Sequence, residues 1–146
     1  EKASFQAGRL LINEIKSRLK KNESISFEST LSGKTWYPIL KQAYKNGYTI
    51  TVYFLYLKNI KTNIRRIKKR VERGGHFVPN KTVLRRYPRC FRNFWNIYRS
   101  LCVDWYIFDN SGKMPLLKSC KTDYDQLSQP DKYKFSGHLL KGFKNE

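Results

Sequence analysis

Residues 48–57 read Tyr-Thr-Ile-Thr-Val-Tyr-Phe-Leu-Tyr-Leu, and this stretch decides the fold. It is β-branched, aromatic and almost continuously apolar, which is typical of a strand buried on both faces of a parallel sheet. Shorter strands are predicted at residues 24–28 and 103–108, and a last one at 114–119. Because helical patterns separate most of them, the order predicts βαβ units and an α/β fold with a mostly parallel sheet.

Helical patterns cover residues 3–22, 38–46, 61–73 and 80–101, the last one interrupted or bent around Pro88. An open sheet of this type normally has about five strands or more, whereas three or four are visible here. We therefore expect one domain that is N-terminally incomplete.

The expected domain covers residues 1–146 and ends in an unassigned tail, at about 120–146, in which one helix is expected after Pro130. The first residue is Glu1 rather than Met, which we interpret as the start of a fragment.

The composition is that of a globular protein, with 40% apolar and 15% aromatic residues. No stretch approaches the roughly 20 apolar residues that cross a bilayer, so no membrane association is expected. The three cysteines form no Cys-x-x-Cys pair, which favours a reducing, cytoplasmic location. With only two histidines, a Cys/His metal site has too few ligands, and we expect no metal.

Positive charge is concentrated in residues 58–92, where thirteen Lys or Arg residues accompany a single acid, Glu72. The chain as a whole has a net charge of +19. Such a segment attracts phosphate groups, whether in a nucleotide, in nucleic acid or on a membrane. The alternative is that most of these lysines form a solvated surface.

A nucleic-acid-binding module is a second interpretation of the same segment. Aromatic residues are interleaved with its charges, as they are in proteins that stack bases. Their spacing of three to four residues is nevertheless more typical of a buried helix face. These residues are Tyr87, Phe91, Phe94, Trp95 and Tyr98.

Three polar elements fall at the carboxyl ends of predicted strands, where ligands gather in α/β sheets. The first is Glu28, followed by the hydroxyl residues Ser29, Thr30 and Ser32. A carboxylate beside hydroxyls can orient a sugar or nucleoside hydroxyl. The alternative is an N-cap, in which Ser32 or Thr35 bonds free N–H groups of the next helix.

The second element is rich in arginine, at Arg70, Arg73, Arg85 and Arg86, around the Gly74-Gly75 pair. Two basic helices joined by a Gly-Gly hinge suit a mobile lid, at about residues 61–92, because arginine forks hold phosphate oxygens. A surface hairpin with its charges in water is the alternative.

The third element is Asp109-Asn110-Ser111, a polar turn after an apolar strand. It either contacts a nucleotide base or only closes the turn.

Taken together, several strings resemble the zeta toxin-like P-loop kinases, a family of AAA-type ATPase/kinase proteins. The resemblance covers about residues 7–117, in the family's order and spacing. The strings are Ala7-Gly8-Arg9-Leu10, Phe27-Glu28-Ser29-Thr30-Leu31-Ser32-Gly33, Gly47-Tyr48, Gly74-Gly75-His76-Phe77-Val78-Pro79, Arg85-Arg86-Tyr87 and Phe108-Asp109-Asn110-Ser111-Gly112.

This resemblance implies a P-loop kinase-like three-layer sandwich and an ATP-dependent phosphotransferase. The acceptor would be a small molecule, UDP-N-acetylglucosamine in toxin members, with ATP and Mg²⁺ as cofactors and an antitoxin protein as a partner. The implied catalytic residues are Arg85, Arg86 and Arg73. The implied acceptor-binding residues are Glu28, Thr30 and Ser32, and those near the nucleotide are His76, Asp109 and Asn110.

The chain departs from the family in one respect that affects activity. No string reads Gly-x-x-x-x-Gly-Lys-Ser/Thr, so the backbone cradle for ATP phosphates is not encoded here. We expect the parent protein to be a kinase and this chain alone to be inactive. A degenerate remnant without activity, and the nucleic-acid-binding module, remain the alternatives.

Overall fold

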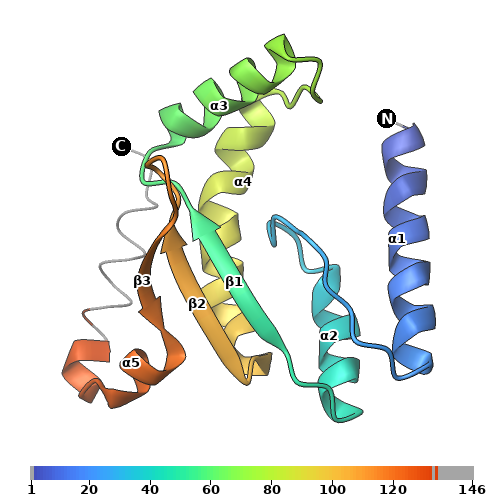
Figure 1. Ribbon diagram of the computed structural model, residues 1–146, viewed down its shortest axis with the longest axis vertical. Helices are drawn as coiled ribbons and strands as arrows, with labels where there is room; N and C mark the ends of the chain where they lie inside the picture. The colour runs from blue at the N-terminus through green and yellow to red at the C-terminus, as the bar shows by residue number, and fades with distance from the viewer. Residues whose placement is uncertain (1, 133, 135–146) are drawn as a thin grey trace.

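The computed structural model describes residues 2–132 and 134, and it has a mixed α/β structure built on a small three-stranded sheet (Figure 1). Strand β1 (Thr51–Tyr56) lies beside β2 (Asp104–Asp109), and β3 (Leu116–Cys120) follows on the far side of β2. The β1–β2 pairing is parallel and the β2–β3 pairing is antiparallel. The α/β prediction is confirmed at this level, but the described sheet is mixed rather than mostly parallel.

Seven helical segments with defined bounds accompany these strands in the described residues, and residues 129–132 are helical as well. The seven segments are α1 (Lys2–Lys20), α2 (Trp36–Lys45), α3 (Ile60–Glu72), α4 (Asn80–Asn93), the π-helix η1 (Phe94–Tyr98), the 3₁₀ turn η2 (Arg99–Leu101) and α5 (Lys121–Gln126). Helix α5 falls in the tail, where no helix was predicted. The helix expected after Pro130 agrees with the helical residues 129–132, and most of its remainder lies outside the described residues.

Helix α4 runs through Pro88 without ending there, so the predicted interruption at this residue is wrong. Proline costs a helix one backbone hydrogen bond. Here Val83 and Phe91, which lie before and after Pro88 in the helix, are both buried, and their burial stabilises the helix on either side of the proline. The helical geometry changes later, at Phe94, where the π-helix begins.

Residues 24–28 were predicted as a strand, and this prediction is wrong for the described structure. The segment has no regular secondary structure, although its burial alternates, with Ile25 and Phe27 half-buried and Ser24, Ser26 and Glu28 exposed. A strand needs a neighbour to complete its backbone hydrogen bonds. No described strand pairs with this segment.

The hydrophobic core lies between one face of the sheet and the α4–η1 stretch. Phe54 of β1 stacks on Phe94 with 4.7 Å between ring centroids, and Ile107 of β2 is fully buried. Phe91 is also fully buried, and Trp95 is 6% exposed. Phe91, Phe94, Trp95 and Tyr98 are therefore core residues, as their helical spacing indicated, and are not free to stack on bases, whereas Tyr87 is half-buried at the edge of the core.

The opposite face of the sheet is much more open. Tyr53 is 64% exposed and Leu55 is 52% exposed, so the prediction of a strand buried on both faces is wrong for β1. The helices that form the core cover only the face that carries Phe54. The expected three-layer sandwich is thus not confirmed by the described residues.

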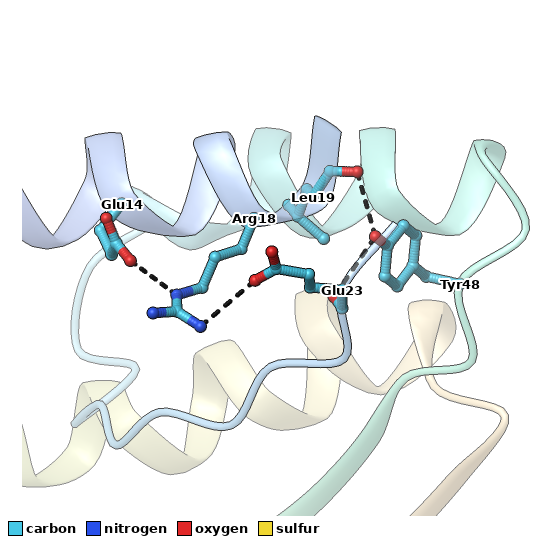
Figure 2. Close-up of polar contacts among 5 residues, drawn as sticks. All are labelled: Glu14, Arg18, Leu19, Glu23 and Tyr48. Carbon is cyan, nitrogen blue, oxygen red and sulfur yellow. Dashed lines mark hydrogen bonds and ion pairs between the residues drawn. The ribbon is translucent and has the colours of Figure 1, made fainter. Parts of the chain in front are cut away.

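Helix α1 lies beside α2, away from the sheet (Figure 1). The Tyr48 hydroxyl donates hydrogen bonds to the carbonyl oxygens of Leu19 and Glu23, at 3.0 and 3.4 Å. Arg18 lies between Glu14 and Glu23, with its nitrogen atoms 2.6 and 3.2 Å from their carboxylates (Figure 2). These contacts fasten the end of α1 to the segment that leads into β1.

Candidate phosphate-binding pocket

A pocket of about 340 Å³ opens at the carboxyl ends of β1 and β2, between α3 and α4. This is the edge of a sheet at which α/β proteins bind ligands. Its lining combines an apolar floor with polar and basic side chains from the two helices. The lining residues are Thr30, Phe54, Leu55, Tyr56, Leu57, Asn63, Arg66, Ile67, Arg70, Val78, Val83, Arg86, Tyr87, Cys90 and Asn110.

Three arginines give this pocket its charge, and its lining contains no acidic residue. Arg66 donates to the Gly112 carbonyl oxygen at 3.3 Å, and Arg70 donates to the His76 carbonyl oxygen at 2.9 Å. Neither bond neutralises a guanidinium. The Arg86 guanidinium makes no hydrogen bond or ion pair with the described part of the chain. The pocket therefore attracts anions and keeps arginine donors available to hold them.

The connection between α3 and α4 contacts one of these arginines, Arg70. Gly74 has a positive φ of 81° and donates to Val71, while Gly75 donates to Arg70 at 2.9 Å. Together these bonds form a Schellman C-cap, which satisfies the last carbonyl groups of α3. The Gly74-Gly75 pair is thus part of an ordered helix end, in addition to joining the two predicted helices.

Asp109 is only 4% exposed. Its carboxylate contacts both its own turn and Lys58. Ser111 donates its backbone N–H to Oδ1 at 2.9 Å, and Lys58 Nζ lies 3.1 Å from Oδ2. The hydrogen bonds from Ser111, followed by Lys58, lower the pKa of Asp109 to about 2. Two roles were predicted for this turn, and the contacts of Asp109 are those of a residue that closes the turn. Asn110, by contrast, lines the pocket.

Tyr87 connects α4 to the end of β1. Its hydroxyl donates to the Leu57 carbonyl oxygen at 2.5 Å, and burial, with Tyr56 nearby, raises the pKa of this hydroxyl to about 12. Tyr87 is therefore a neutral donor that fixes the pocket wall rather than a general base at ordinary pH.

The hydroxyl loop after Glu28 is held against α4 and η1. Asn93 donates its side-chain amide to the Leu31 carbonyl oxygen, and Tyr98 donates its hydroxyl to that of Gly33, both at 2.8 Å. Thr30 and Ser32 have their hydroxyl oxygens 2.9 Å apart. The N-cap alternative is wrong for this loop, because no side chain caps α2 and the residue at that position is Thr35.

A second open pocket, of about 450 Å³, lies beside this loop. It too is basic, and it is separate from the first. Its lining residues are Ser32, Gly33, Lys34, Arg89, Arg92, Asn93, Asn96 and Ile97.

The predicted site residues thus divide into groups. Thr30, Arg86 and Asn110 meet at the first pocket, and Ser32 lines the second. The residues that line neither pocket and are exposed are Glu28, Arg73, His76 and Arg85.

Sequence reasoning did not assign Arg66 or Asn63 to the site, and it gave Arg70 no role beyond the lid. The signal was present, because Asn63, Arg66, Ile67 and Arg70 recur at helical spacing and so share one face of α3. What the sequence did not supply was the direction in which that face points.

No group of three or more His, Cys, Asp or Glu side chains lies close enough together to hold a metal ion within the described stretch. Among the helices described, none combines the length and the apolar character that a bilayer crossing requires.

Comparison with known proteins gives little functional information. No protein-family profile matches the chain, and no solved structure resembles it significantly. An uncharacterized protein of Haemophilus influenzae is 34% identical over 85 residues, which are 58% of this chain and 61% of that protein. The chain therefore spans less than two thirds of this relative.

Proposed function

We propose that this chain is the lid and acceptor-binding part of an ATP-dependent phosphotransferase that acts on a small molecule. The observation that carries the proposal is the acid-free pocket at the carboxyl ends of β1 and β2, with Arg66, Arg70 and Arg86 in its lining. Arginines stabilise the charge that develops on a phosphoryl group in transfer. The acceptor we propose to test first is UDP-N-acetylglucosamine, in keeping with the family resemblance.

The residues present fit the phosphate groups of ATP better than they fit its metal. Three guanidinium groups without a neighbouring carboxylate suit phosphate oxygens. No described cluster offers Mg²⁺ a set of carboxylate ligands. In this proposal the arginines bind and orient phosphate, Thr30 and Asn110 offer polar contacts to the acceptor, and Mg²⁺ chemistry is left to groups outside this pocket.

Calorimetric titration with pyrophosphate, ATP and UDP-N-acetylglucosamine at physiological salt tests the proposal. We expect binding that Arg86→Ala weakens by about tenfold or more, as loss of a charge-assisted hydrogen bond does. Arg85→Ala is the matched control, because it removes the same charge one residue away and Arg85 does not line the pocket. Affinity should change less than about twofold in this control.

Equal losses in the two variants would mean that only the overall positive charge attracts the ligand, and the pocket proposal would be abandoned. Phosphate transfer itself is measured by mass spectrometry of UDP-N-acetylglucosamine after incubation with ATP and a longer protein in which a phosphate-binding loop is joined to this chain, because the chain itself encodes no such loop. A phosphorylated product that Arg86→Ala reduces supports the enzymatic part of the proposal. Binding without any product would limit the proposal to a phosphate-binding domain.

A further inference from the structure

The edge of β1 opposite β2 carries backbone groups without a described partner. The Ile50 and Tyr56 carbonyl oxygens accept hydrogen bonds from Val103 and Asn110, at 2.9 and 2.8 Å. Even-numbered residues of this strand therefore direct their backbone groups toward β2. Successive residues of a parallel strand point their N–H and C=O groups to alternate sides, so Thr51, Tyr53 and Leu55 direct theirs to the open edge.

The sheet face beside this edge is also open. The register places Leu55, Phe108 and Leu117 in one row across the three strands, and Tyr53 next to Tyr106 in another. Tyr53 is 64% exposed, and Leu55 and Leu117 are each 52% exposed. A long, flat, apolar edge is normally covered, because it otherwise pairs with other chains.

A second extended segment ends near the same edge. Residues 24–28 lie on the side of β1 away from β2 (Figure 1), and Thr30, just beyond them, lines the same pocket as Leu55. The alternating burial of this segment is that of a strand, and no described strand pairs with it. A strand added at this edge would therefore lie on the side of β1 that faces this segment.

The charge of the chain indicates what kind of polypeptide supplies that strand. With a net charge of +19, a second copy of this chain would be repelled, whereas an acidic chain would be attracted. We propose that the open edge of β1, with the face of Tyr53 and Leu55, docks an acidic polypeptide that adds an extended apolar strand beside β1. Main-chain hydrogen bonds would supply affinity, as in other cases of strand addition.

A synthetic peptide tests the proposal, with a Val-Ile-Val-Ile-Val centre and two aspartates at each end. We expect this peptide to slow amide hydrogen exchange at Thr51, Tyr53 and Leu55 by about tenfold or more, as pairing of open backbone does. Exchange at Phe54, which faces β2, should not change. A peptide with proline in place of the central Val lacks one donor and should give little protection.

Two variants separate edge pairing from attraction by charge alone. Leu55→Lys places a charge at the open edge and should abolish the protection, whereas Leu117→Lys, on the same face but on β3, should retain it. Thr51→Pro removes a single edge N–H and serves as a second edge variant should Leu55→Lys alter the fold, which circular dichroism reports.

Three results would overturn the proposal. Peptide binding without protection at Tyr53 and Leu55 would place the peptide on another basic surface. Equal protection by the proline peptide would exclude strand pairing. A concentration-dependent dimer in sedimentation experiments that Leu55→Lys dissociates would make a second copy the occupant instead.

Discussion

The Asp109 carboxylate forms an ion pair with Lys58, at 3.1 Å between Oδ2 and Nζ, and this contact ties the end of β2 to the residue that follows Leu57 and β1. Lys58 also donates its backbone N–H to the Ser111 hydroxyl, at 2.8 Å. The two strand ends that frame the pocket are therefore fixed to each other by one buried carboxylate and one turn.

This arrangement predicts a loss of stability in acid. The pKa of Asp109 is lowered from 3.8 to about 2, so its contribution is fully present above pH 3.8 and is lost as the pH falls through about 2. We expect Asp109→Asn to reduce the free energy of unfolding at pH 7 by about 1–2 kcal/mol, because the exposed Lys58 is partly screened by water. Denaturant titrations at pH 7 and pH 2 measure this difference.

The control for Asp109 is Lys58→Ala. Ser111 contributes more than Lys58 to the lowered pKa, so this variant should have the smaller effect. If Lys58→Ala destabilises the protein as much as Asp109→Asn does, the ion pair rather than the turn holds the strand ends together.

The fully buried Phe91 predicts a large loss of stability on truncation. It packs on Phe54 and Trp95, with ring centroids 5.5 and 5.9 Å apart. Phe91→Ala should reduce the free energy of unfolding by about 3–5 kcal/mol through lost burial and a cavity. Phe77→Ala is the comparison, because Phe77 is 61% exposed and its loss should cost at most about 0.5 kcal/mol. Urea denaturation followed by tryptophan fluorescence measures both.

Helix positions were the part of the fold that the sequence predicted best. The periodicity of residues 61–73 and the Gly74-Gly75 stop are local signals, and α3 ends at Glu72. Strand 24–28 was predicted from an equally local alternation, but pairing depends on a neighbour that is distant in sequence. Likewise, the composition of β1 indicated burial without telling which of its faces the helices cover.

The candidate site, like the fold, could be predicted from the sequence only in part. The rule that ligands bind at the carboxyl ends of strands led to Asn110, which follows β2 and lines the pocket. Thr30 also lines the pocket, although the strand predicted before it is absent from the described structure. Which of the adjacent arginines Arg85 and Arg86 faces the pocket depends on the rotation of α4 about its axis. That rotation is fixed by Phe91 and Val83 in the core, and no motif encodes it directly.

Gly75 offers a test of how the helix end positions the pocket. A Cβ at this residue would lie 2.8 Å from the Arg70 carbonyl oxygen, closer than real contacts allow. Gly75→Ala should therefore disrupt the C-cap and displace Arg70, weakening pyrophosphate binding by about tenfold if one charged contact is lost. Gly8→Ala, in α1 with open space around its Cβ, should leave binding unchanged.

The basic surface predicts only weak attraction for nucleic acid. Phe91, Phe94, Trp95 and Tyr98 are buried, so we expect phosphate contacts to dominate binding, and such binding falls steeply with salt. We expect DNA affinity to fade by physiological salt, without preference for sequence, in fluorescence anisotropy titrations. Selective binding that persists at that salt would favour the nucleic-acid-binding module over the kinase.

The lid arginines should affect the rate in a protein that transfers phosphate. If Arg86 meets the migrating phosphoryl group, Arg86→Ala should lower kcat by about 10³-fold, the scale of arginine fingers. The KM for ATP should change less, because the charge that Arg86 meets grows in the transition state. Arg86→Lys should restore only part of kcat, since an ammonium group does not make the two-pronged contact.

Glu28→Gln should act on the acceptor instead. Glu28 is exposed beside the hydroxyl loop and does not line the arginine pocket, so we expect a higher KM for UDP-N-acetylglucosamine with ATP binding unchanged. Single-turnover assays separate these effects, with Arg85→Ala as the charge-matched comparison. Unchanged kinetics in Arg86→Ala would reduce the α3–α4 hairpin to a solvated surface. A loss in Arg85→Ala equal to that in Arg86→Ala would show that the pocket geometry does not decide which arginine acts.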